Sequence, residues 1–448
     1  MSSLKIFFGA LSCYLLTLSV HAQKVLTLDD CFSMAMENNI DLKRVQNNAL
    51  VAQSNQFQAL MNFLPSLGAG VNYSFRNGTF FDQNAARQVS ATTNSSNPSI
   101  NSSLTLYNGF ANHYNVKARR FETQAVEQSI AEQKIEVRAS VLEFYLNVVL
   151  DKENIKISKD RIKLLSAQLE REVKRESVGV GNLEQVYNFK SQLANENLNL
   201  VKLMNRLKSD KLSLLQSLGV DVSEEYEVAP YDFTQDELLM DTENFKDAIN
   251  QSLDSSPSIK RAQAGLQASG YDLKMAHAGY LPVITISGSL GSNYSSNGAL
   301  NPESGSFERD AGFFDQLSFN KFKYLNFSLY IPIFSNWRNR NQTQVAKINL
   351  MNSELDLKQT ELTITNIIQK VYLDLIAAQS TYEAAQENLV ALNQSYEFVS
   401  TRYENGNTDF FTYLASLNSK NTAEIELVNA KYSIIFRKKI LDVYKGMF

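Results

Sequence analysis

Two long stretches of mixed polar and apolar residues contain nothing that would interrupt a helix. Neither Gly nor Pro occurs at 110–178 or at 333–405, and these two residues oppose a helix interior most strongly. At about 1.5 Å of rise per residue, each stretch would form a helix of roughly 100 Å. We therefore predict long helices at 110–178 and 337–405, and the segment 147–154, with two Asn residues, is the place where the first would bend or break.

A glycine turn and a return helix follow each long stretch. One turn is predicted at 179–181, which ends on Gly181, with a return helix at 182–218. The other turn is predicted at 406–407, which begins with Gly406, and its return helix at 408–445.

The first return helix has apolar residues in alternating steps of three and four, apart from the polar residues Glu196 and Asp210. These residues are Val186, Phe189, Leu193, Leu200, Leu203, Leu207 and Leu214. Such spacing makes a narrow apolar seam that packs against a neighbouring helix as in a coiled coil. The alternative, a solitary amphipathic helix on a globular core, accounts less well for the length of the seam.

Alternation with a period of two predicts four strands. In the first strand, Leu67, Ala69, Val71, Tyr73 and Phe75 share one face, and Gly, Asn, Ser and Arg occupy the other. The predicted strands are 67–76, 99–107, 283–294 and 322–333. The segments 77–98 and 295–320 are rich in Asn, Ser or Gly, and we expect solvated loops there.

The same order of elements occurs twice along the chain. Phe63-Leu64-Pro65 corresponds to Tyr280-Leu281-Pro282, and Gly181-Asn182 corresponds to Gly406-Asn407. The first repeat is 23–241, which includes a side segment at 219–241, and the second is 242–448. Each repeat consists of a helix, a strand, a loop, a strand, a long helix, a tight turn and a return helix.

The N-terminal residues 1–22 have the features of a secretory signal peptide. Lys5 precedes an apolar run that ends in the small-residue site Val20-His21-Ala22, so the mature chain would begin near Gln23. A membrane anchor is the alternative, but the run is too short for a span of about 20 residues. The mature chain then retains only Cys31, so an intramolecular disulfide is not possible.

Composition and motifs argue against several classes of function. The net charge of −4 and the 20% of charged residues give no basic surface for nucleic acid. The mature chain has two histidines, His113 and His277, and lacks HExxH, a phosphate-binding glycine loop and a plausible catalytic triad. We therefore predict neither an enzyme nor a metal or cofactor site.

The predicted strands suit a membrane barrel that is shared between chains. Each strand has about the length needed to cross a bilayer when tilted, with one apolar and one small or polar face. Four strands cannot close a barrel, for which about eight is the minimum, so two copies would give eight strands and three would give twelve. The alternative is a soluble four-stranded sandwich with helical stalks, for which the second strand face offers no core.

The ordered motifs resemble those of the TolC-like outer-membrane efflux protein family. They are the signal peptide, the two Leu-Pro stops, Leu106-Tyr107-Asn108-Gly109-Phe110 and Arg402-Tyr403-Glu404-Asn405-Gly406-Asn407. The resemblance implies a mainly α fold: a homotrimer with a 12-stranded barrel in the outer membrane and a long α-helical coiled-coil barrel in the periplasm. It also implies contact with outer-membrane lipid, and a role as exit duct for an inner-membrane pump and a periplasmic adaptor.

Residues near the two turns are the gate candidates that this resemblance implies. Members of the family often carry acidic residues about six and nine positions after the second turn glycine, where this chain has Thr412 and Ala415. Acidic side chains lie nearer the turns, at Asp409 and Glu184. A ring of Asp409 would favour cations, and the alternative is that both are helix N-terminal acids that favour the helix dipole.

Arg402 and Tyr403 are candidates for links that hold the periplasmic tip closed. Tyr403 also continues a heptad seam, so packing is the other interpretation. Two further functions stay open at this point: an exit duct for type I protein secretion, and a periplasmic coiled-coil protein that forms no channel.

Overall fold

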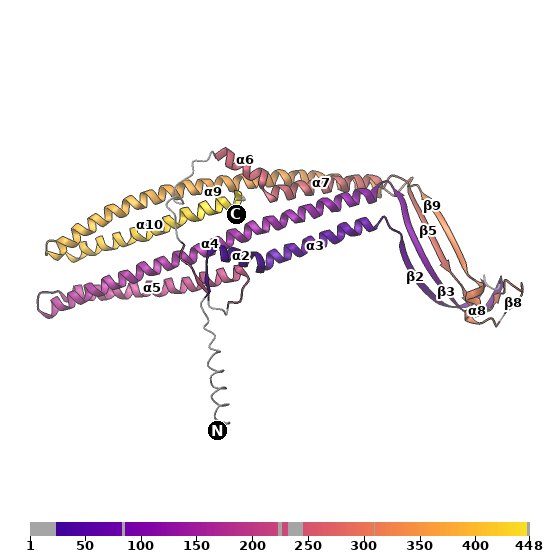
Figure 1. Cartoon of the computed structure of the whole chain (residues 1–448), viewed down its shortest axis with the longest axis horizontal. Coiled ribbons are helices and arrows are strands. Elements are labelled where there is room, and N and C mark those ends of the chain that lie inside the picture. Colours follow the sequence, from indigo (N-terminus) through magenta and orange to yellow (C-terminus); the bar gives the residue numbers. More distant parts are fainter. Residues whose placement is uncertain (1–23, 83–85, 223–225, 232–244, 309, 446–448) are drawn as a thin grey trace, which may run out of the picture. The chain divides into compact units, whose positions relative to one another are not determined.

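The structure is a computed structural model that describes residues 24–82, 86–222, 226–231, 245–308 and 310–445 (Figure 1). The signal peptide expected at 1–22, part of the side segment 219–241 and the first and last few residues of the second repeat lie outside these residues. The chain divides into two compact units. One consists of the described residues of 1–45, 130–256 and 361–448, and the other of 46–129 and 257–360.

Four helices of the first half recur in the second half with the same lengths. The pairs have 11, 22, 67 and 36 residues: α2 (Leu28–Asn38) and α6 (Phe245–Ser255), α3 (Ile40–Met61) and α7 (Pro257–Ala278), α4 (Ala111–Ser177) and α9 (Arg338–Glu404), α5 (Leu183–Leu218) and α10 (Phe410–Lys445). Residue Asn39 separates α2 from α3. The break considered at 147–154 does not occur, because α4 is continuous there and Val148 and Val149 pack into a core.

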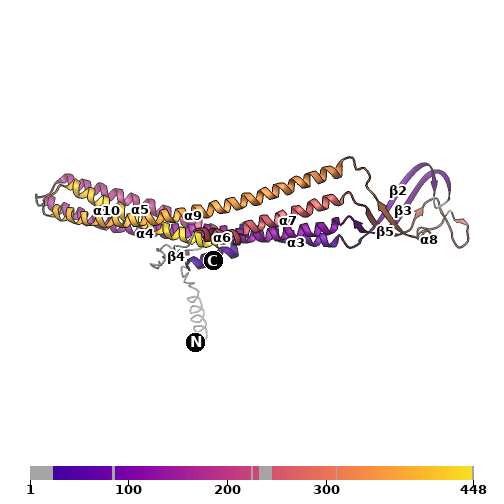
Figure 2. The same ribbon diagram turned by 90° about the horizontal axis from the view of Figure 1, so that it is seen from above.

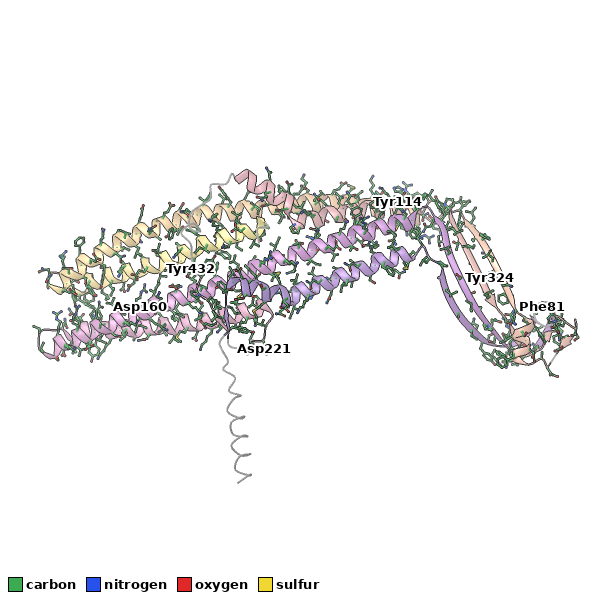
Figure 3. All side chains as sticks on the ribbon, viewed as in Figure 1. Phe81, Tyr114, Asp160, Asp221, Tyr324 and Tyr432 are labelled. Atoms are coloured by element: carbon green, nitrogen blue, oxygen red, sulfur yellow. The ribbon has the colours of Figure 1, made fainter. Side chains whose placement is uncertain are left out.

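One unit contains an antiparallel sheet of order β2-β3-β5-β9, with a short fifth strand, β6 (Tyr294–Ser295), paired to β3. The long strands are β2 (Ser66–Asp82), β3 (Arg87–Asn108), β5 (Val283–Gly291) and β9 (Phe322–Tyr330). Figure 3 shows side chains projecting from this sheet, among them Tyr324 on β9.

The structure corrects two loop predictions. The segment 77–98 continues β2 and β3, which stay paired from Ser66 with Ser103 to Asp82 with Arg87. Backbone pairing holds this hairpin without regular apolar alternation, because Asn, Ser and Thr predominate on both of its faces. The segment 295–320 contains β7 (Ala299–Leu300), β8 (Phe307–Glu308) and α8 (Phe313–Phe319).

The two later strands are shorter than expected. Pairing of β5 with β9 runs from Val283 with Tyr330 to Gly291 with Phe322. Pro332 follows the end of β9 and has no N–H to donate, which explains why the strand does not continue to 333.

The strand register separates an apolar face from a polar face, because residues directly opposite each other in an antiparallel pair lie on the same face. Leu104, Ile286 and Phe327 form one row of the apolar face. The neighbouring row on the other face consists of Ser103, Ser287 and Asn326. A β-bulge at Leu106 keeps Tyr107 opposite Ile284.

The other unit contains two helical hairpins. In both views α5 lies along α4 and α10 lies along α9 (Figures 1 and 2). Near the middle of α4, a core joins α2, α4, α5 and α10 to a parallel pair of short strands, β1 (Lys24–Leu26) and β4 (Tyr226–Val228). The Tyr145 hydroxyl donates to the carbonyl of Ala229 at 3.1 Å and fixes the side segment to this core.

Over the described residues, every helix is too polar or too short to qualify as a membrane span.

Candidate functional site

The two helical hairpins end in turns of the same design. Gly179 and Gly406 both have left-handed backbones, with φ of 80° and 73°. After each glycine, an N–H reaches back to the long helix: Val180 to the carbonyl of Arg175 at 3.1 Å, and Asn407 to that of Arg402 at 2.8 Å. This is the usual glycine-terminated helix end. The structural equivalent of Gly406 is therefore Gly179, and the sequence correspondence of Gly181 with Gly406 was wrong by two residues.

At Gly181, a steric constraint rather than a positive φ requires glycine. An added Cβ would lie 2.4 Å from the backbone nitrogen of Glu176, so the chain passes too close to the end of α4 for any side chain. By contrast, nothing lies within 4 Å of a Cβ added to Gly179 or Gly406, and their positive φ alone accounts for the residue type.

The acidic candidates lie at the starts of the return helices. Asp409 precedes α10, and its carboxylate accepts hydrogen bonds from the N–H of Thr412 at 2.9 Å and from its hydroxyl at 2.6 Å. These bonds hold the pKa of Asp409 below its ordinary value. Glu184 is exposed in the first turn of α5, where the side chain of Asn182 accepts from its N–H at 2.8 Å. Asp409 is thus a helix cap as well as an exposed charge.

An aromatic cluster lies between the two hairpins, in the helical residues next to the turns. Tyr403 stacks on Tyr413 with ring centroids 4.7 Å apart, and Phe189 meets Phe410 edge-on at 4.9 Å. All four side chains are buried. Gln168 on α4 donates to the hydroxyl of Tyr413, which ties the long helix of one hairpin to the return helix of the other.

A buried carboxylate lies next to this cluster. Glu172 on α4 is 1% exposed, and its Oε1 accepts from the Tyr403 hydroxyl at 3.4 Å. Its cationic neighbours are Arg175, with Nη1 at 3.5 Å, and Arg171, with Nε at 3.8 Å. Gln185 lies equally close to the same hydroxyl, at 3.4 Å. Burial, and after it the charge of Glu172, raise the pKa of Tyr403 to about 12.

Arg402 and Arg171 make different kinds of contact, and the sequence alone did not indicate which of them would link the two hairpins. Arg402 donates to the carbonyl of Asn407 at 3.1 Å, within its own turn. Arg171 instead reaches the other hairpin and pairs with Glu404 at 3.2 Å. The sequence drew no attention to Arg171 or Glu172, because both lie in a highly charged run that is typical of a solvated helix face.

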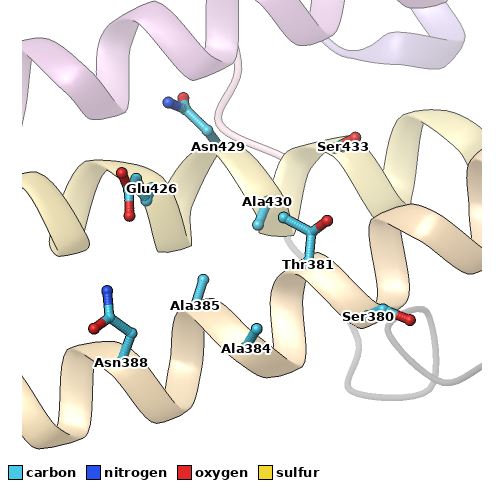
Figure 4. A pocket seen from close by; sticks show the side chains of 9 residues that line it. All are labelled: Ser380, Thr381, Ala384, Ala385, Asn388, Glu426, Asn429, Ala430 and Ser433. Atoms are coloured by element: carbon cyan, nitrogen blue, oxygen red, sulfur yellow. The ribbon is translucent and has the colours of Figure 1, made fainter.

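Two of the hollows on the hairpins are lined by more than one helix. One, of about 310 Å³, lies beside the turns and is lined by Arg175, Glu184, Tyr403 and Asp409, among others. The other, of about 840 Å³, is a groove between α9 and α10 (Figure 4). Its walls include Ala384, Ala385 and Ala430, whose side chains are too short to fill the space between the helices. Thr412 is exposed near the first hollow and is not among its lining residues.

Comparison with known proteins gives the same fold and a family. The sequence model of the outer membrane efflux protein family matches twice, at 31–220 and 248–438. The outer membrane protein TolC of Salmonella enteritidis is 20% identical over 409 residues, which are 91% of this chain and 79% of TolC.

Solved structures agree along nearly the whole chain. The outer membrane protein VceC of Vibrio cholerae superposes with a TM-score of 0.78 at 17% identity and covers 94% of this chain and 96% of its own. The CmeC outer membrane channel of Campylobacter jejuni gives 0.75 at 16% identity, over 94% of this chain and 85% of its own.

The chain therefore belongs to the outer membrane efflux protein family, and the resemblance seen in the motifs is confirmed. It is an outer-membrane channel protein with a periplasmic helical extension, and not an enzyme. Family membership also opposes the alternative of a coiled-coil protein that forms no channel.

Proposed function

We propose that three copies of the chain assemble into the passive exit duct of a tripartite efflux system. The observation that carries this proposal is the sheet. Over the residues that the structure describes, β2 is paired on one side by β3, and β9 on one side by β5. Both outer edges thus have free backbone groups, which a membrane-embedded sheet must pair. Three copies joined edge to edge would give a barrel of 12 long strands.

The two faces of the sheet support the same assembly. The apolar face suits lipid, and the face of Ser, Asn, Gly and Thr suits a water-filled lumen. The long helices would continue the duct into the periplasm, where two hairpins from each copy make a ring of twelve rods. Exposed apolar residues of α9 at helical spacing, Val345, Ile348, Leu355 and Leu362, would pack against a neighbouring copy.

The hairpin turns would receive the periplasmic adaptor. The exposed residues Val178, Val180 and Leu183 surround the first turn, and Phe411 is exposed beside the second. A group of exposed apolar side chains at a turn is typical of a protein interface. An inner-membrane pump would then deliver substrate through the adaptor to the duct.

The cluster around Glu172 would hold the tip closed. The Tyr403 hydroxyl and Arg171 both cross from one hairpin to the other, and the ends of the long helices α4 and α9 cannot move apart while these contacts persist. Opening would separate Tyr403 from Glu172 and Arg171 from Glu404. Arg402, which contacts its own turn, would contribute less to this latch.

Fractionation and cross-linking test the assembly. We expect the protein in the outer-membrane fraction, with a lysine-reactive cross-linker trapping a trimer, and the purified protein to form ion-conducting pores in planar bilayers. A mature chain that stays monomeric and forms no pore would contradict the proposal. The pump that co-purifies would distinguish small-molecule efflux from type I protein secretion.

A further inference from the structure

The apolar face of the sheet carries one charged side chain in its four long strands, at Lys323. The register places Lys323 opposite Leu290, in the same row as Ile100 and Ala69. Residues Leu325, Phe327 and Leu329 follow it on the same face, and all three are exposed. A lysine in the middle of a lipid-facing band costs about 2–4 kcal/mol, and near the membrane surface about 0–1 kcal/mol.

The position along the strand places this lysine at the outer membrane surface. Lys323 lies near the end of β9 that is remote from α9. At about 3.3 Å per residue and a tilt near 40°, the stretch from Lys323 to Ile331 rises about 20 Å. Ile333 lies beyond it and is 94% exposed. On β9, the apolar band of about 25 Å that membrane barrels present thus ends near Lys323, on the side away from the periplasmic helices.

The ammonium group of Lys323 has no counter-ion among the residues that the structure describes. Over the same residues, no side-chain hydrogen bond or ion pair is found for Lys323 or for Lys321, two positions earlier. A lysine is a compact charge that binds phosphate well, and its methylene groups can lie on apolar surface while the charge reaches the head-group layer. An anionic lipid head group would be a suitable partner for this charge.

The same face of the sheet changes character beyond the apolar band. Between Phe75 and Phe81, the outward positions of β2 and β3 are Asn77 opposite Thr92, and Thr79 opposite Ser90. All four side chains are exposed, neutral and able to donate and accept hydrogen bonds. Such a surface suits the hydroxyl groups of a sugar chain that projects outward from the membrane.

We infer that Lys323 and Lys321 bind the phosphate groups of a phosphorylated glycolipid of the lipid A class in the outer leaflet. The polar extension of β2 and β3 then contacts the sugar chain of the same lipid layer. The inference rests on the barrel proposed above, since it requires the apolar face to meet lipid.

Thermal unfolding in nanodiscs tests this inference. Wild-type protein is compared in phosphatidylcholine alone, with added lipopolysaccharide, with dephosphorylated lipopolysaccharide and with phosphatidylglycerol. We expect lipopolysaccharide to raise the unfolding midpoint by several degrees, and dephosphorylation to remove the shift. An equal shift with phosphatidylglycerol would overturn the assignment to a glycolipid.

Variants identify the residues. Lys321→Gln with Lys323→Gln should lose the shift, and Lys321→Arg with Lys323→Arg should keep it. Lys347→Gln with Lys358→Gln, at exposed positions of α9, is the matched control and should keep it as well. A full shift in the first variant would overturn the inference.

Conductance of the same preparations separates the two proposals. If wild-type protein forms no pore, the barrel itself is wrong. If it conducts and lipopolysaccharide gives no shift, the barrel stands and the glycolipid site is wrong.

Discussion

The Tyr403 hydroxyl is the smallest group whose removal would test the latch. Tyr403→Phe keeps the ring, and with it the stacking on Tyr413. It removes the donor to Glu172, whose carboxylate is almost completely buried. Hydrogen bonds to charged groups contribute about 1.5–3 kcal/mol, and at 3.4 Å this one belongs below that range, at about 1 kcal/mol.

If three copies open together, the free-energy losses of the three copies add. A loss of about 1 kcal/mol in each copy would make about 3 kcal/mol in the proposed trimer. Since about 1.4 kcal/mol is a factor of ten, the ratio of closed to open channels would fall on the order of 100-fold. The resting conductance of single channels in planar bilayers should rise accordingly.

A matched tyrosine provides the control. Tyr187 on α5 is 61% exposed, and the ammonium of Lys190 lies 5.1 Å from its ring centroid, so Tyr187→Phe removes a hydroxyl near the turns without touching Glu172. Its resting conductance should match that of the wild type. Unchanged conductance in Tyr403→Phe would refute the latch and favour seam packing as the role of this residue. Adding Arg402→Ser should change little further, because Arg402 contacts its own turn.

Three further predictions concern the turns. Asp409→Asn preserves a good helix cap and removes the charge. If Asp409 forms a ring of carboxylates at the tip, this variant should show weaker cation selectivity in single-channel recordings. Unchanged selectivity would leave only the capping role. In Gly179→Ala the added methyl group has open space around it, and the positive φ alone should reduce stability by about 1 kcal/mol. In Gly181→Ala the methyl group collides with the backbone of Glu176, so the tip should be destabilised more. Limited proteolysis of the two variants measures this difference. The pKa of Tyr403 is raised from 10.0 to about 12, so the stability that its neutral hydroxyl contributes is present below pH 10 and is lost as the pH rises towards 12. The urea concentration at the unfolding midpoint should therefore fall less between pH 10 and pH 12 in Tyr403→Phe than in the wild type.

Local pattern was sufficient for the elements themselves. The stretches without Gly and Pro became α4 and α9, because nothing in them interrupts helical hydrogen bonding. The period-two alternation from Leu67 to Phe75 located β2 and indicated which of its faces is apolar. The repeated order of motifs indicated the family, because the spacing of turns and strands follows from how many residues each element needs.

Tertiary structure decided the extent of the sheet and the contacts around Glu172 and Tyr403. Nothing local distinguishes 77–98 from a loop, since its strands are held by each other's backbone rather than by side-chain burial. Glu172 and Tyr403 are separated by 231 residues, and the charged run around Glu172 has the pattern of a solvated face. The carboxylate is buried because the other hairpin packs over it. The local sequence of a helix cannot indicate a contact with a residue so distant in the chain.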